Sequence, residues 1–352
     1  MKPNIKDLSF SDFEAYLREH QQPAYRAKQV WQWLYQKHAG SFGEMTNLSA
    51  SLREQLGQDF SISRLAIERQ ADSVDGTVKF LFRLADDHSI ESVLIPETRR
   101  LTLCISTQAG CGFGCAFCAT ALLGLKRNLR ASEIVDQILE ASRTLDDDRR
   151  ITNVVLMGMG EPLANYHETI KALDVMTDNL WGIGISPRRI TLSTVGLVPQ
   201  IYRLMDETKV NLAISLHAAT DELRSQLMPV NRKYSLRQLI DCCRALPIPR
   251  RKRITFEYVM LRGVNDSPAD AHRLIELLRG IRCKINLIPF NPHPGGEFGR
   301  PETDDVEVFQ QILYSHGLQV NVRRPRGDDI AAACGQLQGE AMSDKARPTD
   351  HC

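Results

Sequence analysis

Three cysteines lie within eight residues of one another, at Cys111, Cys115 and Cys118. Thiolates at this spacing can hold a four-iron, four-sulfur cluster while leaving one iron without a protein ligand, and a small molecule can bind that open iron. A structural zinc site normally takes four ligands in two separated pairs, and none of the nine histidines lies near the three cysteines. The spacing therefore favours an iron-sulfur cluster, with zinc as the alternative.

The composition limits the kinds of protein that this chain can be. Its 352 residues are 43% hydrophobic, as in ordinary globular proteins, and no apolar run reaches the length of about eighteen residues that spans a bilayer. Nine cysteines are an odd number, and the first residues contain no apolar signal segment. We therefore expect a cytoplasmic protein with free cysteines and no membrane association.

Basic residues are unevenly distributed, although the net charge is only +1. A net charge near zero argues against general nucleic-acid binding, and a single basic cluster is most simply a solvated surface. Two of the four clusters flank the three cysteines, which makes a phosphate-bearing substrate a reasonable hypothesis. The clusters are Arg99 with Arg100, Lys126 with Arg127 and Arg130, residues 250–253, and Arg323 with Arg324 and Arg326.

Two segments precede the region that contains the cysteines. Residues 1–75 predict a helical module, because apolar residues recur at helical spacing from Ala27 to Leu34. Residues 76–100 predict a β-hairpin extension, in which two β-rich runs are joined by a polar turn at 86–88.

From Leu101 onward, short β-branched runs alternate with amphipathic helical stretches. This alternation predicts right-handed βαβ units and a parallel sheet. Six such units predict an α/β fold, a partial and open TIM-type (βα)6 barrel over residues 101–322. Residues 323–352 then form a C-terminal segment with Cys334, in a setting that suits a mobile reactive thiol, and a flexible tail with Cys352. The predicted strands begin at residues 101, 153, 189, 211, 254 and 284, and the predicted helices cover 131–145, 166–178, 198–206, 236–246, 269–279 and 304–316.

Polar and glycine-rich segments follow the predicted strands. They lie at 158–162, 193–196, 215–217 and 291–294, and the cysteine motif itself follows the first barrel strand. Because the C-terminal ends of parallel strands meet at one edge, all five segments should converge on one site. An open iron beside the carboxylate of Glu161 suits a zwitterionic amino acid group, and S-adenosylmethionine (SAM), a source of carbon radicals, is the natural candidate.

Several motifs resemble those of a known family. The segment from Cys111 to Cys118, with Phe117 before the last cysteine, resembles the signature of the radical SAM superfamily. With the further motifs, it resembles the bacterial RNA adenine-C2 methyltransferases that act on 23S ribosomal RNA and, in many members, on transfer RNA. The likeness runs in order from about residue 5 to residue 338. The further motifs are ESVLIP at 91–96, LKRNLRASEI at 125–134, MGMGEPLAN at 157–165, LSTVG at 192–196, ISLHAATDELRSQLMPVN at 214–231, TFEYVML at 255–261, NLIPFNP at 286–292 and RGDDIAAACGQL at 326–337.

The resemblance implies a mechanism that suits this substrate. C2 of adenine is electron-poor and cannot attack the SAM methyl group, whereas a carbon radical can add to C2. By similarity, Cys334 takes a methyl group from one SAM, and a second SAM on the single [4Fe-4S] cluster yields a deoxyadenosyl radical that activates that methyl group. Cys104 then attacks the sulfur of Cys334, which releases methylated RNA and leaves a disulfide between the two cysteines. Glu91 is the family's candidate for the base that removes the C2 proton, and the Cys104 thiolate is the alternative.

The resemblance also implies partners and SAM contacts. The cluster would need an electron donor, and the disulfide would need a reductant. The helical module and the basic clusters would contact RNA phosphates, and the target base would have to leave its stack to reach the site. A monomer is the default oligomeric state. The SAM contacts implied by the family are Gly160, Glu161, Ser193, Ser215, Leu216, His217 and Asn291.

The sequence alone leaves two other functions as alternatives. Enzymes that methylate C8 of the same adenine and confer antibiotic resistance share the cluster, the two reactive cysteines and the fold. A non-catalytic RNA-binding protein with a structural zinc would be colourless and indifferent to SAM, and it would leave Cys334 unexplained. Without the family, Cys104 would be interpreted as a small buried hydrophobe. Cys242, Cys243 and Cys283 are expected in the core.

Overall fold

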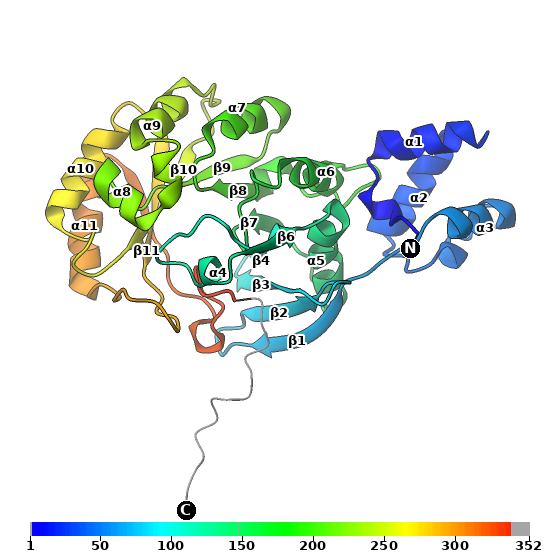
Figure 1. Ribbon diagram of the computed structural model, residues 1–352, viewed down its shortest axis with the longest axis horizontal. Coiled ribbons are helices and arrows are strands. Elements are labelled where there is room, and N and C mark those ends of the chain that lie inside the picture. Colours follow the sequence, from blue (N-terminus) through cyan, green and yellow to red (C-terminus); the bar gives the residue numbers. More distant parts are fainter. Residues whose placement is uncertain (1, 147, 339–352) are drawn as a thin grey trace, which may run out of the picture.

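Three helices form an N-terminal lobe in the computed structural model, which describes residues 2–146 and 148–338. They are α1 (Phe10–Glu19), α2 (Tyr25–Tyr35) and α3 (Ala50–Asp59), and Figure 1 shows them standing beside the barrel. The side chains of Ser9 and Ser49 cap α1 and α3 by accepting a hydrogen bond from the backbone N–H three residues later. The apolar faces of the lobe pack around Trp31, whose ring centre lies 5.1 Å from that of Phe13. The predicted helical module is therefore present, and its last helix ends well before residue 75.

Ion pairs join this lobe to the barrel. Lys6 Nζ lies 2.5 Å from Asp136 Oδ1, and both side chains are almost fully buried. Arg64 donates two hydrogen bonds to the carboxylate of Glu140, at 2.9 and 2.8 Å. Both acids lie on α5 (Ala131–Arg143), a barrel helix that faces the lobe (Figure 1). Because a buried charge that loses its partner is costly, the Lys6 pair strongly favours this arrangement of the two parts.

An antiparallel meander leads into the barrel. Its strands are β1 (Ala66–Asp72), β2 (Val78–Arg83) and β3 (Ser89–Glu97). β2 and β3 form the predicted hairpin, whereas β1 was not predicted and falls within the range expected to be helical. The reason is its sequence, AIERQAD, which is largely exposed and has no continuous apolar face. β1 pairs with β2, and β3 pairs with the first barrel strand.

Seven parallel strands form the wall of the barrel, within a sheet of order β1-β2-β3-β4-β7-β8-β9-β10-β11-β12. They are β4 (Arg100–Cys104), β7 (Asn153–Leu156), β8 (Ile190–Thr194), β9 (Asn211–Ser215), β10 (Ile254–Met260), β11 (Cys283–Pro289) and β12 (Gln319–Val322). Six match the predicted strands. The seventh, β12, was missed because it has four residues, of which only two are apolar. In the described ranges β1 and β12 are the edge strands, so the barrel is open, as predicted.

Helices cover the outside of this barrel (Figure 1). After α5 they are α6 (Tyr166–Thr177), α7 (Val198–Glu207), α8 (Asp221–Leu227), α9 (Leu236–Ala245), α10 (Pro268–Leu278) and α11 (Thr303–Ser315), and the short α4 (Ala119–Leu122) follows the cysteine loop. The six predicted helices are present, and α4 and α8 are additional. Between residues 2 and 338, leaving aside residue 147, no helix is both long and apolar enough to cross a bilayer.

Alternation along the strands separates the core from the lumen of the barrel. Ile214 and Phe256 are fully buried in the hydrophobic core. Their neighbours Ser215 and Glu257 point to the other face, and the parallel register aligns Ser215 with Glu257 and Glu257 with Asn286. Asn286 Nδ2 donates a hydrogen bond of 2.9 Å to Glu257 Oε1. A row of polar side chains therefore crosses the lumen, from the end of β9 to the middle of β10 and β11.

Candidate active site

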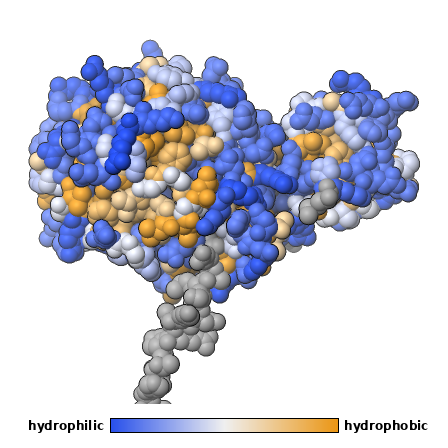
Figure 2. Space-filling model, in the orientation of Figure 1, coloured by the Kyte–Doolittle hydropathy of each residue, from blue (hydrophilic) through white to orange (hydrophobic). Residues whose placement is uncertain are grey.

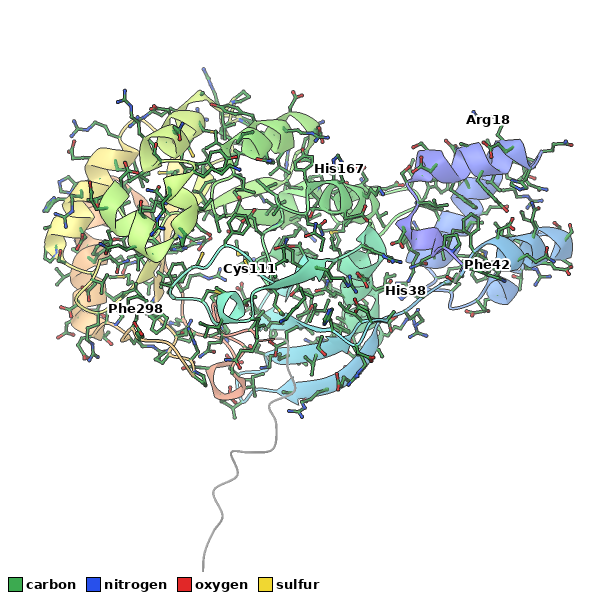
Figure 3. All side chains as sticks on the ribbon, in the orientation of Figure 1. Arg18, His38, Phe42, Cys111, His167 and Phe298 are labelled. Carbon is green, nitrogen blue, oxygen red and sulfur yellow. The ribbon has the colours of Figure 1, made fainter. Side chains whose placement is uncertain are left out.

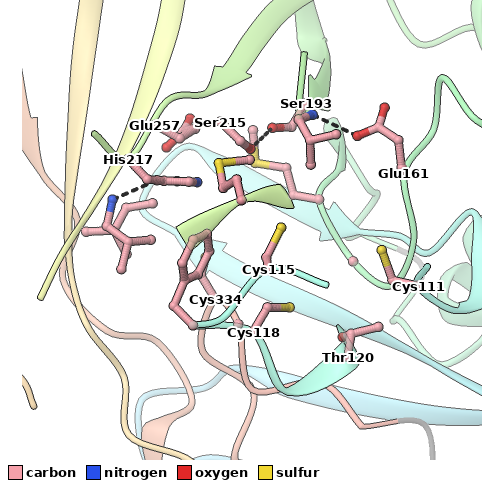
Figure 4. A pocket seen from close by; sticks show the side chains of 18 of the residues that line it. Cys111, Cys115, Cys118, Thr120, Glu161, Ser193, Ser215, His217, Glu257 and Cys334 are labelled. Carbon is pink, nitrogen blue, oxygen red and sulfur yellow. Dashed lines mark hydrogen bonds between the residues drawn. The ribbon is translucent and has the colours of Figure 1, made fainter. Parts of the chain in front are cut away.

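One cavity lies at the C-terminal ends of the parallel strands, and the predicted segments converge on it. Its volume is about 160 Å³. Figure 3 places Cys111 in the middle of the barrel, and Figure 2 shows hydrophobic side chains gathered on this face of the barrel. Figure 4 shows the three clustered cysteines facing a wall that carries Glu161, Ser193 and Ser215. The predicted site residues that line the cavity are Cys111, Cys115, Cys118, Gly160, Glu161, Ser193, Ser215, His217, Asn291 and Cys334.

A two-stranded sheet and a glycine turn hold the cysteine loop. β5 (Gln108–Gly110) and β6 (Leu125–Asn128) pair antiparallel at the two ends of this segment. The backbone N–H of Cys111 donates to the Gly124 carbonyl at 3.0 Å. Gly110 has a φ of +76°, and a Cβ there would lie 1.9 Å from the Gly124 oxygen, so only glycine fits. The position of Cys111 is thus set by local backbone geometry.

The three clustered thiols fit an iron-sulfur cluster better than a zinc ion. All three are half-buried, and burial raises the pKa of Cys111 to about 11 and also raises the pKa of Cys115. Buried thiols of this kind ionise when a metal cation is next to them. Within the described residues, no three His, Cys, Asp or Glu side chains converge closely enough to hold one metal ion. A structural zinc takes four ligands, whereas three thiolates suit a four-iron cluster, in which each ligand binds a different iron and the fourth iron stays open.

Glu161 is a buried carboxylate on the cavity wall. Its oxygens accept hydrogen bonds from the backbone N–H groups of Leu163 at 3.0 Å and Val195 at 2.8 Å. Burial raises its pKa to about 7. Gly160, just before it, has a φ of +96°, and a Cβ there would lie 2.5 Å from the Gln108 side chain, so this turn also requires glycine. Glu161 is therefore held rigidly where it can face an ammonium group in the cavity.

His217 presents a neutral imidazole to the cavity (Figure 4). Its Nδ1 accepts a hydrogen bond of 2.9 Å from the Val259 N–H, which leaves the ring proton on Nε2. Burial, and secondarily the nearby Arg224, lower its pKa to about 3. The adjacent Leu216 is different, because its side chain is fully buried and its backbone N–H donates to the Glu257 carbonyl. Leu216, predicted as a SAM contact, does not line the cavity.

Arg224 organises two of the converging loops, and sequence reasoning missed it. Its guanidinium is almost fully buried and donates to the carbonyls of Val195 at 2.8 Å, Ser215 at 3.1 Å and Leu216 at 3.2 Å. These hydrogen bonds compensate for the loss of water around the buried charge. The positive charge also favours the thiolate form of Cys115. An arginine within a helical segment ordinarily predicts a surface position, so the sequence contained no clear signal for this role.

Cys334 lies on a loop beside the cavity. Asn291 Nδ2 donates to the Cys334 carbonyl at 3.2 Å, and the Ala119 N–H donates to the Gly335 carbonyl at 2.8 Å. The thiol is open to the cavity, although protein atoms surround it. Burial raises its pKa, and Arg323 opposes that rise through its positive charge and a side-chain hydrogen bond. Asn291, predicted as a SAM contact, therefore also positions the Cys334 loop.

Cys104 is the last residue of β4 and is half-buried. Burial, and secondarily the nearby Cys334, raise its pKa to about 12. Cys104 does not line the cavity itself. The structure therefore brings the two predicted reactive cysteines close together, with Cys334 on the cavity side.

Glu91 contacts the Cys334 loop and does not line the cavity. Its buried carboxylate forms an ion pair of 3.1 Å with Lys79 and accepts a hydrogen bond of 2.7 Å from the Gln338 N–H. Lys79 in turn donates to the Ala331 carbonyl at 3.2 Å. The pair thus holds the loop on both sides of Cys334.

Glu257 and Arg323 are two further charged residues of the cavity wall that sequence reasoning did not identify as site residues. Burial raises the pKa of Glu257, and Arg323 is the main group that opposes this rise. The alternation in ITFEYVM offered a signal, because Glu257 shares its strand face with Thr255 and Val259. Arg323 follows a strand that was itself not predicted, so its position could not be inferred.

Two protein-family models match the chain. The model of the radical SAM superfamily matches residues 105–275, which include the cysteine loop and most of the barrel. The model of the ribosomal RNA large subunit methyltransferase N-terminal domain matches residues 3–62, which contain the helical lobe.

Individual proteins extend this likeness over nearly the whole chain. The dual-specificity RNA methyltransferase RlmN of Syntrophobacter fumaroxidans is 49% identical over 336 residues, which cover 96% of this chain and 98% of that protein. The protein of the same name from Syntrophus aciditrophicus is 50% identical over 342 residues, covering 97% and 98%. Among solved structures, a radical SAM methyltransferase from Sphaerobacter thermophilus matches with a TM-score of 0.90 and 44% identity, over 96% of this chain and 100% of that one.

Proposed function

The chain belongs to the RlmN family of dual-specificity RNA methyltransferases within the radical SAM superfamily, and from this premise we propose that it methylates C2 of a specific adenine in 23S rRNA and in tRNA. The observation that carries the proposal is the convergence of three clustered thiols and a fourth, separate thiol on one cavity. A binding protein would have no use for the fourth thiol. The family also disfavours the zinc-containing RNA-binding alternative.

The cavity residues have distinct roles in this proposal. Cys111, Cys115 and Cys118 would hold one [4Fe-4S] cluster, and Glu161 would face the ammonium group of SAM. The remaining proposed SAM contacts are Gly160, Ser193, Ser215, His217 and Asn291, which line the cavity, and Leu216, which does not. When bound, the cluster and SAM supply carbon-radical chemistry, which the electron-poor C2 requires. The apolar lining of the cavity excludes water from that chemistry (Figure 2).

Cys334 is the proposed acceptor of the methyl group. Its thiol opens to the cavity, and Arg323 favours the thiolate that a displacement reaction needs. The new bond would join the Cys334 sulfur to the methyl carbon, the bond between that carbon and the SAM sulfonium sulfur would break to release S-adenosylhomocysteine, and the thiol proton would leave. A second SAM is used to activate this methyl group, so each turnover consumes two.

Cys104 is the proposed resolving thiol. Once RNA is joined to Cys334 through the methylene carbon, attack of Cys104 on that sulfur breaks the carbon–sulfur bond and forms a disulfide between the two cysteines. A two-electron reductant must then restore both thiols. Glu91 and Cys104 are both proposed as candidates for removing the C2 proton: both oxygens of Glu91 face Lys79 or the Gln338 N–H, and burial raises the pKa of Cys104 to about 12.

The rest of the chain would recognise RNA and support the site. We assign residues 1–75 to RNA binding, 76–100 to an extension that supports the Cys334 loop, 101–322 to the barrel and 323–352 to the reactive segment. Residues 339–352 of that last segment, with Cys352, lie outside the described residues. We propose a cytoplasmic location, in keeping with RNA substrates. We also propose that a separate donor supplies electrons to the cluster, that a reductant restores the two thiols, and that the enzyme is a monomer.

The test is methylation of a 23S rRNA fragment and of tRNA by anaerobically reconstituted protein, with the modified nucleosides identified by mass spectrometry. The expected product is 2-methyladenosine in both RNAs, and Cys334→Ala should give none. A product methylated at C8 would favour the antibiotic-resistance class. Product in rRNA alone would remove tRNA from the proposal.

A further inference from the structure

A second cavity opens at the opposite end of the barrel, and its volume is about 980 Å³. The strand residues that line it are the first or second residues of their strands, namely Thr191, Asn211, Thr255, Lys284 and Gln319. Because these strands are parallel and the cysteines lie at their C-terminal ends, the two cavities open at opposite ends of the lumen. Along β9 the two ends are separated by about 13 Å.

Cations dominate the lining of this second cavity. They are Arg188, Lys209, Arg250, Arg251, Lys252, Arg253 and Lys284, and no carboxylate lines the cavity with them. Within the described part of the chain, none of these cations forms an ion pair, although Glu257 lies within electrostatic reach of Lys284. Arg127 shows the opposite arrangement, because Asp86 and Glu133 both neutralise it. Like charges gathered without counter-charges favour an anionic ligand.

Backbone contacts hold these cations in place. Lys252 Nζ donates to the carbonyls of Lys209 and Val210, and Arg282 Nη1 donates to the Pro249 carbonyl at 3.1 Å. Burial, and secondarily Arg188, lower the pKa of Lys252, which shows how closely the positive charges are packed. The side chains of Arg250, Arg251 and Arg253 in the same loop remain exposed. The loop therefore presents arginines, which suit phosphate, from an anchored backbone.

We propose that this second cavity binds phosphate groups of a large folded RNA, outside the stem-loop that presents the adenine to the cysteines. The inference rests on the proposed function. A phosphodiester chain can enter a concave cavity, whereas a folded acidic protein presents its carboxylates on a convex surface. An RNA that fills both cavities must reach around the barrel, which a 23S rRNA domain can do and a short stem-loop cannot. The cavity would thus favour the larger substrate.

The test compares two double variants of the full chain that remove the same charge. Arg188→Gln with Arg251→Gln alters the second cavity. Arg237→Gln with Arg279→Gln alters exposed arginines that are already paired with Asp241 and Glu276. Dissociation constants are measured from 50 to 200 mM salt for a 23S rRNA domain and for the stem-loop alone. For the large RNA, the cavity variant should lower the slope of log affinity against log salt by about 1.5, which corresponds to two lost phosphate contacts. The stem-loop and the control variant should behave as wild type.

Several outcomes would overturn the inference. These are an unchanged slope for the large RNA, an equal loss for the stem-loop, or an equal loss in the control variant. If the cavity variant binds both RNAs normally but loses turnover with a protein electron donor and not with dithionite, the cavity docks an acidic protein instead. Methylation by the wild type is measured in the same preparation. Its absence would contradict the proposed function, whereas intact methylation with unaltered RNA binding would contradict only this inference.

Discussion

Lys79 and Glu91 form an ion pair of 3.1 Å that holds the Cys334 loop from two sides. Lys79 donates to the Ala331 carbonyl, before Cys334, and Glu91 accepts from the Gln338 N–H, after it. One Glu91 oxygen faces the lysine and the other faces the backbone. Glu91 therefore positions the Cys334 loop, beside the role as base that the family resemblance implies.

Replacing Lys79 should loosen the Cys334 loop. Lys79→Met leaves the buried Glu91 carboxylate without its cation, and we expect a loss of about 3 kcal/mol in the free energy of unfolding. Hydrogen exchange should also rise over residues 328–338. Lys171→Met is the matched control, since it breaks a more exposed pair of the same length, 3.1 Å, with Glu168. The control should lose less than about 1 kcal/mol, and unchanged exchange in Lys79→Met would contradict the positioning role.

Removing Arg323 should make Cys334 less reactive. The cation favours the thiolate, so Arg323→Met should raise the pKa of Cys334 further and lower the thiolate fraction at pH 8. We expect alkylation of Cys334 by iodoacetamide to slow by roughly tenfold, the effect of a change of one pKa unit. The rate is read by mass spectrometry of the Cys334 peptide in cluster-free protein across a range of pH. Arg323→Lys should restore most of the rate, and equal rates in all three proteins would exclude this role.

The barrel and most of its site were predictable from sequence because they depend on local patterns. Short β-branched runs marked six of the parallel strands, and the rule that ligands sit at the C-terminal ends of such strands brought the cysteines and Glu161 to one place. The strand β12 was not predictable, because four residues with two valines carry too weak a signal. Arg323, which follows that strand, was missed as a site residue for the same reason.

Other features depend on contacts between residues far apart in sequence. The partners of Glu91 lie 12 residues before it and 247 residues after it, and no local pattern encodes such pairing. Arg224 looked like a surface residue of a short helix, yet three carbonyls from two loops surround its guanidinium. Leu216 is a predicted SAM contact from its place in a motif, and strand alternation directs its side chain into the core, so only its backbone could make that contact.

Protonation of Glu161 should make stability depend on pH. Its pKa is about 7 in the folded protein and 4.5 ordinarily, because burial disfavours the charged form. Between these values the folded protein keeps a proton that the unfolded chain has lost, so stability should fall as pH rises through this window. The difference of 2.5 pKa units corresponds to about 3 kcal/mol. The free energy of unfolding, measured with urea at pH 4.5 and pH 8, should fall more in wild type than in Glu161→Gln. An equal change in the two proteins would contradict this prediction.

Loss of one clustered thiol should abolish the metal centre. Anaerobically purified wild type should contain about four irons and four sulfides per chain and absorb visible light, and Cys118→Ala should lose both. Cys242→Ala is the control, because Cys242 is buried in α9 away from the cavity. A colourless wild type with about one zinc per chain would contradict the cluster and favour the zinc-binding alternative.

Removing Cys104 should trap RNA on the enzyme. Without the resolving thiol, the bond between Cys334 and the methylene carbon on C2 cannot be broken by disulfide formation. Cys104→Ala should therefore accumulate a covalent adduct, seen as a band of reduced mobility with labelled RNA on a denaturing gel. Cys104→Ala combined with Cys334→Ala should give no adduct. Free methylated RNA at wild-type levels in the single variant would remove Cys104 from the mechanism. The mass of the adduct also tests the base, because retention of the C2 hydrogen supports Cys104 as its acceptor and loss of that hydrogen assigns the step to another group.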